Sequence, residues 1–390
     1  MYDNNGNCKK IELDRDFGEV KNISLMILSL LAKRALYVGG EEMDIAKVDK
    51  NMAVKKMVDT KGLKIYDVLE APFKIYGASL PDEKEDKFKR VPGDFAEKVS
   101  EWVNALHANT SGVRVRFATN SKRIAIRAFM PAIHKMPHFA LTGSSGFDLY
   151  AETKYVKTFV PPFDIEQGYE SEIETDGQMH DYTINMPLYS EVSRLYVMLE
   201  EGAELKEAKP YKYEKPIVYY GSSITQGGCA SRPGNIYQNI ISRRLDTNYV
   251  NLGFSGSAKA EDIMAEYISG LDMSIFVYDY DHNAPDVEHL EKTHEKMFKT
   301  IRRKHPDLPI ICISRPDNLM NMEARREIIR KTVENAKAAG DKNVYFIDGQ
   351  SFSALCDEPD AITVDGVHPN DLGFAMMGKV IGDKIAEILK

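Results

Sequence analysis

Cysteine is scarce in this sequence: its 390 residues include only four, Cys8, Cys229, Cys312 and Cys356. Their spacings match no zinc-binding pattern, and a chain of this length can bury a sizeable core without disulfides. We therefore expect reduced, unpaired thiols, as in proteins of a reducing compartment. Cys312, inside the apolar run 308–313, is expected to be buried as a small apolar side chain.

Basic charge is also limited. Lys and Arg number 51 against 59 Asp and Glu, which gives a formal net charge of −8. Nucleic acids and anionic membrane surfaces attract basic patches, and no basic cluster stands out along the chain. Neither a nucleic acid nor a membrane is therefore expected as a partner. The hydrophobic content of 43% is nevertheless enough for a globular core.

Long apolar runs are missing as well. The longest candidate, residues 23–32, is far shorter than the ~20 residues that a membrane-spanning helix needs. The acidic residues Glu12, Asp14, Asp16 and Glu19 precede it, where a signal peptide would have basic ones. We therefore expect a cytoplasmic protein.

Residues 1–42 differ from the rest of the chain. They are polar, then apolar, and they end in Gly-Gly-Glu-Glu just before Met43. Codons for Gly-Gly-Glu-Glu are purine-rich and can resemble a bacterial ribosome-binding site upstream of a start codon. One hypothesis is that Met43 is the natural start and that residues 1–42 are an over-extended reading frame. The other is an added amphipathic helix at the N-terminus.

From about Gly62 to Glu200, within a domain assigned to residues 43–205, apolar and polar positions alternate in many short runs, such as 113–117 and 182–186. Strands with one buried face have this period of two. Clusters of Gly, Asn, Asp and Ser separate the runs. The pattern predicts a jelly-roll-like β-sandwich, interrupted by one helix near residues 95–106 that carries the only tryptophan, Trp102.

A charged segment with proline, residues 206–215, is predicted to be a linker. Beyond it, residues 216–390 alternate short apolar strands with helical stretches. The expected strands are 216–220, 248–253, 273–279, 308–314 and 343–348. The expected helices are 232–246, 259–270, 286–305, 320–339 and 371–389. This order predicts a three-layer α/β/α domain, a doubly wound parallel sheet of flavodoxin-like type, with sites at the carboxyl ends of its strands.

Ser223 lies two residues beyond the first of these strands, where its hydroxyl can attack a carbonyl group. A serine is a weak nucleophile at neutral pH, so it needs an imidazole base oriented by a carboxylate. Asp365 and His368, three residues apart near the C-terminus, can place both side chains in one cleft. Each motif alone also has a structural explanation, since a Ser-Ser pair suits a turn or an N-cap and Asp-Gly is common in turns. Ser222 is the rival nucleophile.

Two further residues follow strands and can stabilise negative charge. Gly256 lets the backbone approach closely and offer its N–H to an oxyanion, and the Asn283 side chain can donate a second hydrogen bond or stabilise a turn. A different interpretation is a metal site formed by Asp279, Asp281 and His282. Structural hydrogen bonds at the buried end of a central strand explain these polar residues better, and no metal or other cofactor is expected.

These motifs, in this order, resemble the four sequence blocks of the SGNH/GDSL hydrolase superfamily. The first block, Gly-Asp-Ser, is similar to Gly221-Ser222-Ser223 and implies that Ser223 is the nucleophile. Gly256 and Asn283 match the glycine and the asparagine of the second and third blocks. Asp365 and His368 match the Asp-x-x-His of the last block.

The resemblance implies a serine esterase with Ser223, His368 and Asp365 as the catalytic triad. The backbone N–H groups of Ser223 and Gly256 and the Asn283 side chain would form the oxyanion hole. Two positions depart from the family pattern. Ser222 stands in place of an aspartate, and Asp281-His282-Asn283-Ala284 stands in place of Gly-x-Asn-Asp.

A second resemblance concerns the N-terminal half. Gly146-Phe147-Asp148-Leu149-Tyr150 is similar to the Gly-x-Asp-Leu-Tyr signature of a β-sandwich that precedes some SGNH esterase domains, and we expect Asp148 and Tyr150 to be structural. Such two-domain proteins are similar to carbohydrate esterases that remove acetyl groups from plant polysaccharide fragments. The resemblance thus implies an acetylesterase for acetylated oligosaccharides. A lipid or thioester hydrolase of the same superfamily and a catalytically silent carbohydrate-binding protein are the alternatives, and the oligomeric state stays open.

Overall fold

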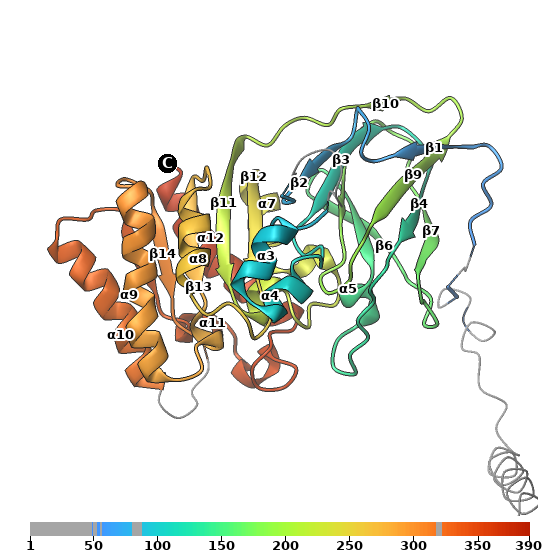
Figure 1. The fold of residues 1–390 in the computed structure, drawn as a ribbon. Helices are drawn as coiled ribbons and strands as arrows, with labels where there is room; N and C mark the ends of the chain where they lie inside the picture. Colours follow the sequence, from blue (N-terminus) through green and yellow to red (C-terminus); the bar gives the residue numbers. More distant parts are fainter. Residues whose placement is uncertain (1–48, 50–52, 55–56, 80–87, 317–321) are drawn as a thin grey trace, which may run out of the picture. The chain divides into compact units, whose positions relative to one another are not determined.

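The computed structural model describes residues 49, 53–54, 57–79, 88–316 and 322–390 (Figure 1). The two hypotheses about residues 1–42 and Met43 therefore concern residues outside the described ones, as does Cys8. Residues 54–390 form one compact unit. Within its described residues, no helix is long and apolar enough to cross a membrane.

The first half of this unit consists of two antiparallel sheets, and the predicted β-sandwich is confirmed. Among the described residues, one sheet has the order β1-β9-β4-β7, and the other has the order β10-β3-β8-β5-β6 with β2 beside β3. The strands are β1 (Leu63–Asp67), β2 (Lys74–Tyr76), β3 (Arg114–Thr119), β4 (Arg123–Phe129), β5 (Phe147–Ala151), β6 (Lys154–Phe159), β7 (Gly168–Glu174), β8 (His180–Asn185), β9 (Arg194–Glu200) and β10 (Leu205–Lys206).

Alternate residues of β3 point to opposite faces of its sheet. Val115 and Phe117 pack into the apolar core between the two sheets. Arg114 and Arg116 lie on the other face, and both are buried as well. The expectation of one buried face is therefore wrong for β3, because the second half of the chain covers its polar face.

The predicted helix near residues 95–106 is two helices. They are α3 (Gly93–Val99) and α4 (Glu101–Leu106). Ser100 separates them in an extended conformation, and its hydroxyl accepts a hydrogen bond from the Val103 N–H at 3.1 Å. An N-cap of this kind starts a new helix without any proline or glycine to mark the break. Trp102 is largely exposed on α4.

The second half is a parallel sheet with helices on both faces, so the predicted three-layer fold is confirmed (Figure 1). The described strands, in the order β12-β11-β13-β14-β15, are β11 (Tyr213–Gly221), β12 (Thr247–Gly253), β13 (Ile275–Asp279), β14 (Ile310–Ile313) and β15 (Val344–Ile347). The α-helices are α6 (Ser223–Gln226), α7 (Tyr237–Leu245), α8 (Asp262–Ser269), α9 (Val287–Lys304), α10 (Met322–Ala338), α11 (Gln350–Ser353) and α12 (Asp371–Ile388), and a short α5 (Leu141–Ser144) precedes β5.

The central strand β11 is apolar on both sides. Val218 and Tyr220 pack into the core beneath α8, α9 and α10, whereas Ile217 and Tyr219 pack into the core beneath α7 and α12. A strand buried on both faces has a continuous apolar run, which the sequence shows here. Cys312 on β14 is fully buried, as predicted.

Candidate active site

The turn after β11 separates the roles of the two neighbouring serines. Ser222 is fully buried, and its hydroxyl accepts a hydrogen bond from the Ile224 N–H at 3.2 Å as the N-cap of α6. Ser223 is the first residue of α6 and is partly exposed. The structural explanation for a Ser-Ser pair therefore holds for Ser222, while the Ser223 hydroxyl stays free of the cap.

Ser223, His368 and Asp365 lie in one hydrogen-bonded series. Ser223 Oγ is 2.9 Å from His368 Nε2, and His368 Nδ1 is 2.7 Å from Asp365 Oδ2. A carboxylate beside Nδ1 holds the proton on that nitrogen, which leaves the lone pair of Nε2 facing the serine. The arrangement can therefore take the hydroxyl proton as the oxygen attacks an electrophile.

The loop around Gly366 keeps the Asp365 side chain in its carboxylate form, as a hydrogen-bond acceptor. Asp365 Oδ1 accepts hydrogen bonds from the backbone N–H groups of Val367 at 3.0 Å and His368 at 2.7 Å. Partial burial alone would raise the pKa of Asp365, but these two bonds and the bond to the imidazole lower the pKa to about 2. The carboxylate is thus ionised at neutral pH and can stabilise a protonated His368.

Gly256 and Asn283 lie on the adjacent loops that follow β12 and β13. Gly256 is exposed, with a positive φ of +66° that favours glycine. Asn283 Nδ2 donates a hydrogen bond to the Phe254 carbonyl at 2.8 Å and so ties the two loops together. One amide hydrogen of Asn283 and the N–H groups of Ser223 and Gly256 have no acceptor among the described residues. These are the donors that an oxyanion hole needs.

Asp281 has a structural role beneath Asn283. It is buried, and it accepts hydrogen bonds from Arg325 Nε at 2.8 Å and from the Arg315 N–H at 2.9 Å. Arg325 also donates to the Ala284 carbonyl at 3.0 Å. Because one guanidinium binds both ends of this turn, it fixes the loop that carries Asn283.

Asp279 forms hydrogen bonds with a different set of side chains. Its Oδ2 accepts hydrogen bonds from Thr225 Oγ1 at 3.1 Å and from Tyr237 OH at 3.3 Å. Burial raises the pKa of Asp279 to about 7. Within the described part of the chain, no group of three or more His, Cys, Asp or Glu side chains is arranged to hold a metal ion. The metal-site interpretation of Asp279, Asp281 and His282 is therefore not supported.

Three residues near Ser223 were not anticipated. Tyr189 OH donates a hydrogen bond to the Ser223 carbonyl at 3.3 Å. Cys229 is buried nearby, and this burial together with the negative charge of Asp365 raises the pKa of its thiol to about 11. Cys229 thus stays protonated at neutral pH and does not compete with Ser223 as a nucleophile.

The third residue, His138, comes from the β-sandwich. It is exposed on the loop between β4 and β5, and its ring centroid lies 6.2 Å from that of His368. The next residue, Phe139, is buried against Tyr189, with ring centroids 5.3 Å apart. The sandwich therefore contributes a side chain beside the candidate base. No periodic pattern marks this loop, so His138 could not be identified from the sequence.

Asp148 and Tyr150 connect the sandwich to the α/β domain. Asp148 is fully buried and accepts hydrogen bonds from Asn185 Nδ2 at 2.7 Å and from the Gly234 N–H at 2.7 Å. Arg232 binds both Asp148 and the Tyr150 hydroxyl. A Cβ atom at position 234 would lie 2.6 Å from Asp148 Oδ2, so only glycine fits there. These contacts support the structural interpretation of Asp148 and Tyr150.

The comparisons with known proteins agree with this architecture. Residues 214–386 match the GDSL-like Lipase/Acylhydrolase family, and residues 63–205 match the family described as the N-terminus of Esterase_SGNH_hydro-type. The search of curated proteins gave no match.

Solved structures are similar over most of the chain. A protein described as a GDSL-like lipase from Bacteroides ovatus is 29% identical, with a TM-score of 0.75 over 84% of this chain and 98% of that chain. The salicylyl-acyltransferase SsfX3 of a tetracycline biosynthetic pathway is 21% identical, with a TM-score of 0.69 over 84% and 98%. A family two carbohydrate esterase from Clostridium thermocellum, in complex with cellohexaose, is 16% identical, with a TM-score of 0.52 over 72% and 93%.

Proposed function

Because residues 214–386 belong to the GDSL-like lipase/acylhydrolase family and residues 63–205 to the N-terminal domain of SGNH-type esterases, we propose that this esterase removes O-acetyl groups from plant-derived oligosaccharides. Both resemblances inferred from the sequence, and the enzyme class, are confirmed by these matches. The observation that carries the mechanism is the hydrogen-bonded series of Ser223, His368 and Asp365.

The reaction begins at Ser223. His368 Nε2 takes the hydroxyl proton as Oγ attacks the ester carbonyl carbon, and Asp365 stabilises the imidazolium that forms. The carbonyl oxygen becomes an oxyanion, which accepts hydrogen bonds from the Ser223 and Gly256 N–H groups and from the Asn283 amide. His368 then returns the proton to the sugar oxygen, which leaves as the alcohol and gives the acyl-enzyme.

Water completes the cycle by the same groups. His368 takes a proton from a water molecule, whose oxygen attacks the acyl carbon of the Ser223 ester. The second oxyanion collapses, Ser223 Oγ leaves with the proton from His368, and acetate is released. No cofactor enters any step.

Two observations favour a carbohydrate ester. The site is open, since Asp365 and Gly256 are exposed and the exposed His138 of the sandwich flanks His368. An open site leaves room for the sugar units on either side of the ester. The fold is shared with family two carbohydrate esterases, one of which binds cellohexaose. We place the reaction in the cytoplasm, on imported oligosaccharides.

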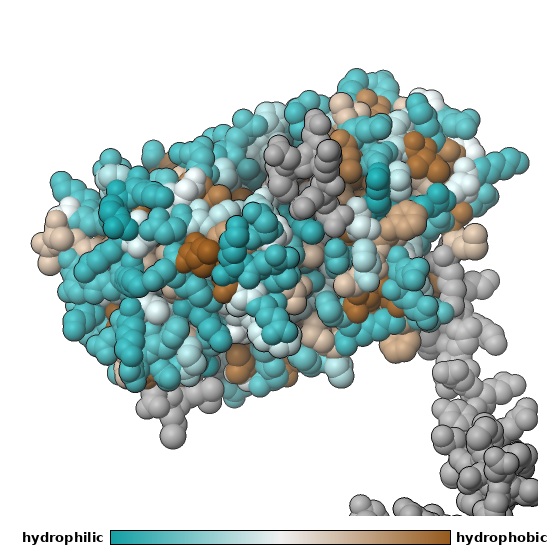
Figure 2. Space-filling view, viewed as in Figure 1, coloured by the Kyte–Doolittle hydropathy of each residue, from teal (hydrophilic) through white to brown (hydrophobic). Residues whose placement is uncertain are grey.

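A lipid hydrolase is the weaker alternative. Lipid-binding surfaces gather large apolar side chains into a continuous patch. On the face shown in Figure 2, apolar residues form small separate groups among hydrophilic ones. The silent-binding alternative conflicts with a complete series of Ser223, His368 and Asp365, and failure of Ser223 to react with a fluorophosphonate probe would favour it.

Mass spectrometry of acetylated xylan and mannan oligosaccharides tests the proposal. Incubation with the protein is expected to remove acetyl groups one at a time, while the Ser223→Ala variant leaves the masses unchanged. Fast hydrolysis of octanoyl esters with no loss of acetyl from either oligosaccharide would overturn the acetylesterase assignment and favour the lipid hydrolase.

A further inference from the structure

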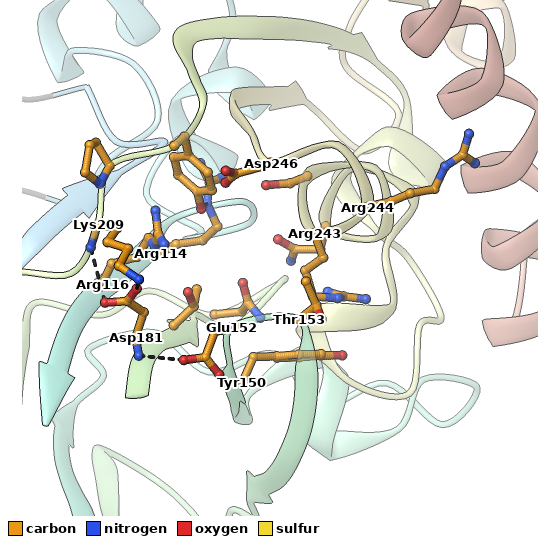
Figure 3. Close-up of a pocket in the computed structure, with 16 residues that line it drawn as sticks. Arg114, Arg116, Tyr150, Glu152, Thr153, Asp181, Lys209, Arg243, Arg244 and Asp246 are labelled. Carbon is orange, nitrogen blue, oxygen red and sulfur yellow. Dashed lines mark hydrogen bonds and ion pairs between the residues drawn. The ribbon is translucent and has the colours of Figure 1, made fainter. Parts of the chain in front are cut away.

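A cavity of about 430 Å³ lies between the β-sandwich and the α/β domain and is lined by residues of both (Figure 3). Tyr211 and Asp246, which precede the first residues of β11 and β12, contribute to its wall. Ser223 instead follows the carboxyl end of β11. The cavity therefore lies at the amino ends of the parallel strands, and the candidate active site lies at their carboxyl ends. Ligand pockets of about 300–1,000 Å³ accommodate small organic molecules.

Strand register brings the polar side chains of this wall together. Arg116 on β3 pairs with Thr183 on β8, which pairs with Tyr150 on β5. These residues occupy the face of the sheet opposite the sandwich core, and all three line the cavity. Arg243, from the last turn of α7, lies on the opposite wall in Figure 3.

The neighbouring Arg114 has hydrogen-bond acceptors for its guanidinium N–H groups. Its guanidinium donates to the Tyr211 hydroxyl at 3.2 Å, to the Gly112 carbonyl at 2.6 Å and to Asn248 Oδ1 at 2.8 Å. A further bond reaches the Tyr249 carbonyl at 3.2 Å. Arg114 therefore serves the contact between the two domains.

Arg116 and Arg243 lack such partners. Arg116 is only 8% exposed, yet its Nε and Nη1 atoms have no hydrogen-bond acceptor among the described residues. The buried Nη1 of Arg243 has none either. Their guanidinium groups stack on tyrosine rings, Arg116 at 4.2 Å from Tyr211 and Arg243 at 4.1 Å from Tyr150. Stacking leaves the N–H groups in the guanidinium plane unsatisfied, which is costly for a buried cation.

The acidic residues of the wall are engaged elsewhere. Glu152 accepts hydrogen bonds from His180 Nδ1 at 3.1 Å and from the Asp181 N–H at 3.1 Å. Asp181 accepts from the Lys209 N–H at 3.2 Å, and Asp246 accepts from the Lys212 N–H at 3.1 Å. In the described part of the chain, none of the three forms an ion pair with Arg116 or Arg243. The two guanidinium groups are thus left to bind an external anion.

We propose that this cavity is a second ligand site, which binds a molecule of about monosaccharide size through an oxyanion held by Arg116 and Arg243. The oxyanion is a carboxylate or a phosphate, since arginine binds both through paired N–H donors. Thr183, which lies between Arg116 and Tyr150 in the register of the sheet, offers a hydroxyl to the rest of the ligand. This site is independent of ester hydrolysis at Ser223.

Calorimetric titration of the full chain tests the site with four probes: glucuronate, glucose 6-phosphate, inorganic phosphate and uncharged glucose. We expect one of the two sugar anions to bind most tightly, which identifies the oxyanion as carboxylate or phosphate. Inorganic phosphate should bind more weakly than that sugar anion, because it leaves most of the cavity empty. Glucose binding as tightly as both sugar anions, or no heat from any anion at millimolar concentrations, would overturn the proposal.

Variants locate the binding. Arg116→Gln and Arg243→Gln should each weaken the tightest anion by about 10-fold or more. Arg244→Gln is the matched control, because Arg244 also lines the cavity but its guanidinium pairs with Asp383 and extends away from Arg243 (Figure 3). Ser223→Ala should bind the anion as the parent protein does. Equal affinity in the parent and the Arg243→Gln variant would contradict the site.

If Arg116→Gln does not fold, a measurement on the protein without substitutions can replace it. Phenylglyoxal modifies accessible arginine side chains, and peptide mass mapping shows which ones. The bound anion is expected to protect Arg243, whose side chain is partly exposed, while Arg194, an exposed arginine of β9, reacts equally with and without the anion. Unchanged modification of Arg243 at a saturating anion concentration would rule the site out.

Discussion

Ser223 Oγ and His368 Nε2 lie 2.9 Å apart although 145 positions separate them in the sequence. The serine is held at the carboxyl end of β11, and the imidazole on the loop before α12. Ser222, one residue earlier, is buried in the cap of α6 and cannot take the same place. This geometry therefore identifies Ser223, and not Ser222, as the serine that reacts.

Ser223→Ala should reduce the hydrolysis of 4-nitrophenyl acetate by about 10⁴–10⁶-fold, because it removes the nucleophile. Ser222→Ala should keep activity within about 10-fold but lower the free energy of unfolding by about 1 kcal/mol through loss of the N-cap. Initial rates and urea unfolding of both variants check this. The reverse ranking of activities would make Ser222 the nucleophile.

Asp365→Asn should lower kcat by about 10⁴-fold, because a neutral amide no longer selects the tautomer with its proton on Nδ1. Since the pKa of Asp365 is about 2, its carboxylate stays ionised as the pH falls from 8 to 4. Asp365 should therefore add no acid limb to the kcat/KM profile between pH 4 and 8. A limb within this range that disappears in Asp365→Asn would contradict the low pKa of this carboxyl group.

Asn283→Ala should lower kcat by about 10²–10³-fold with little change in KM, because an oxyanion donor acts in the transition state. Asn283 also binds the Phe254 carbonyl, so the variant needs a fold control. Its unfolding midpoint should fall only slightly, because Asp281 and Arg325 still hold the turn. A drop in activity that follows the loss of folded protein would assign Asn283 to structure alone.

The sequence predicts those parts of the molecule in which local pattern and burial agree. In β11, Ile217, Val218, Tyr219 and Tyr220 are all apolar because both faces of the strand are covered, and the run identifies a central strand. Ser223 and His368 are predictable because their neighbours carry turn and cap chemistry with fixed spacing. Each of these signals lies within a dozen residues of the feature that it predicts.

The remaining features depend on contacts between distant segments. Arg114 and Arg116 alternate with apolar residues as if they faced solvent, but the α/β domain buries them. Asp148 and Gly234 form a hydrogen bond between the domains, and neither local sequence identifies its partner. A domain interface of this kind has no sequence period, so neither the arginine-lined cavity nor His138 could be predicted.

Asp279 gives a stability prediction with a definite sign. Its pKa is raised from 3.8 to about 7 in the folded protein, so the folded state binds more protons than the unfolded state between these values. The contribution of Asp279 to the free energy of unfolding is therefore greatest below pH 4. This contribution falls as the pH rises to about 7. Asp279→Asn, which keeps an acceptor for Thr225 and Tyr237, should remove this decline.

The size of that effect can be bounded. A shift from 3.8 to about 7 corresponds to at most about 4 kcal/mol between the two ends of the range. Urea unfolding at several pH values should show the parent losing stability across this range and the variant losing less. Parallel curves for the two proteins would mean that Asp279 is ionised throughout. The exposed Asp262→Asn on α8 is a control that should leave the slope unchanged.

His138 allows the role of the β-sandwich in substrate binding to be measured. Its imidazole is exposed 6.2 Å from that of His368, so it can contact a sugar unit next to the ester without reaching the acyl carbon. His138→Ala should raise KM for acetylated oligosaccharides by about 5-fold, which corresponds to one hydrogen bond of about 1 kcal/mol. The rate with 4-nitrophenyl acetate, which has no sugar, should change little. His134→Ala, on the same exposed loop, should affect neither substrate. If His138→Ala lowered kcat equally for both substrates, the residue would act on His368 itself and not on the sugar.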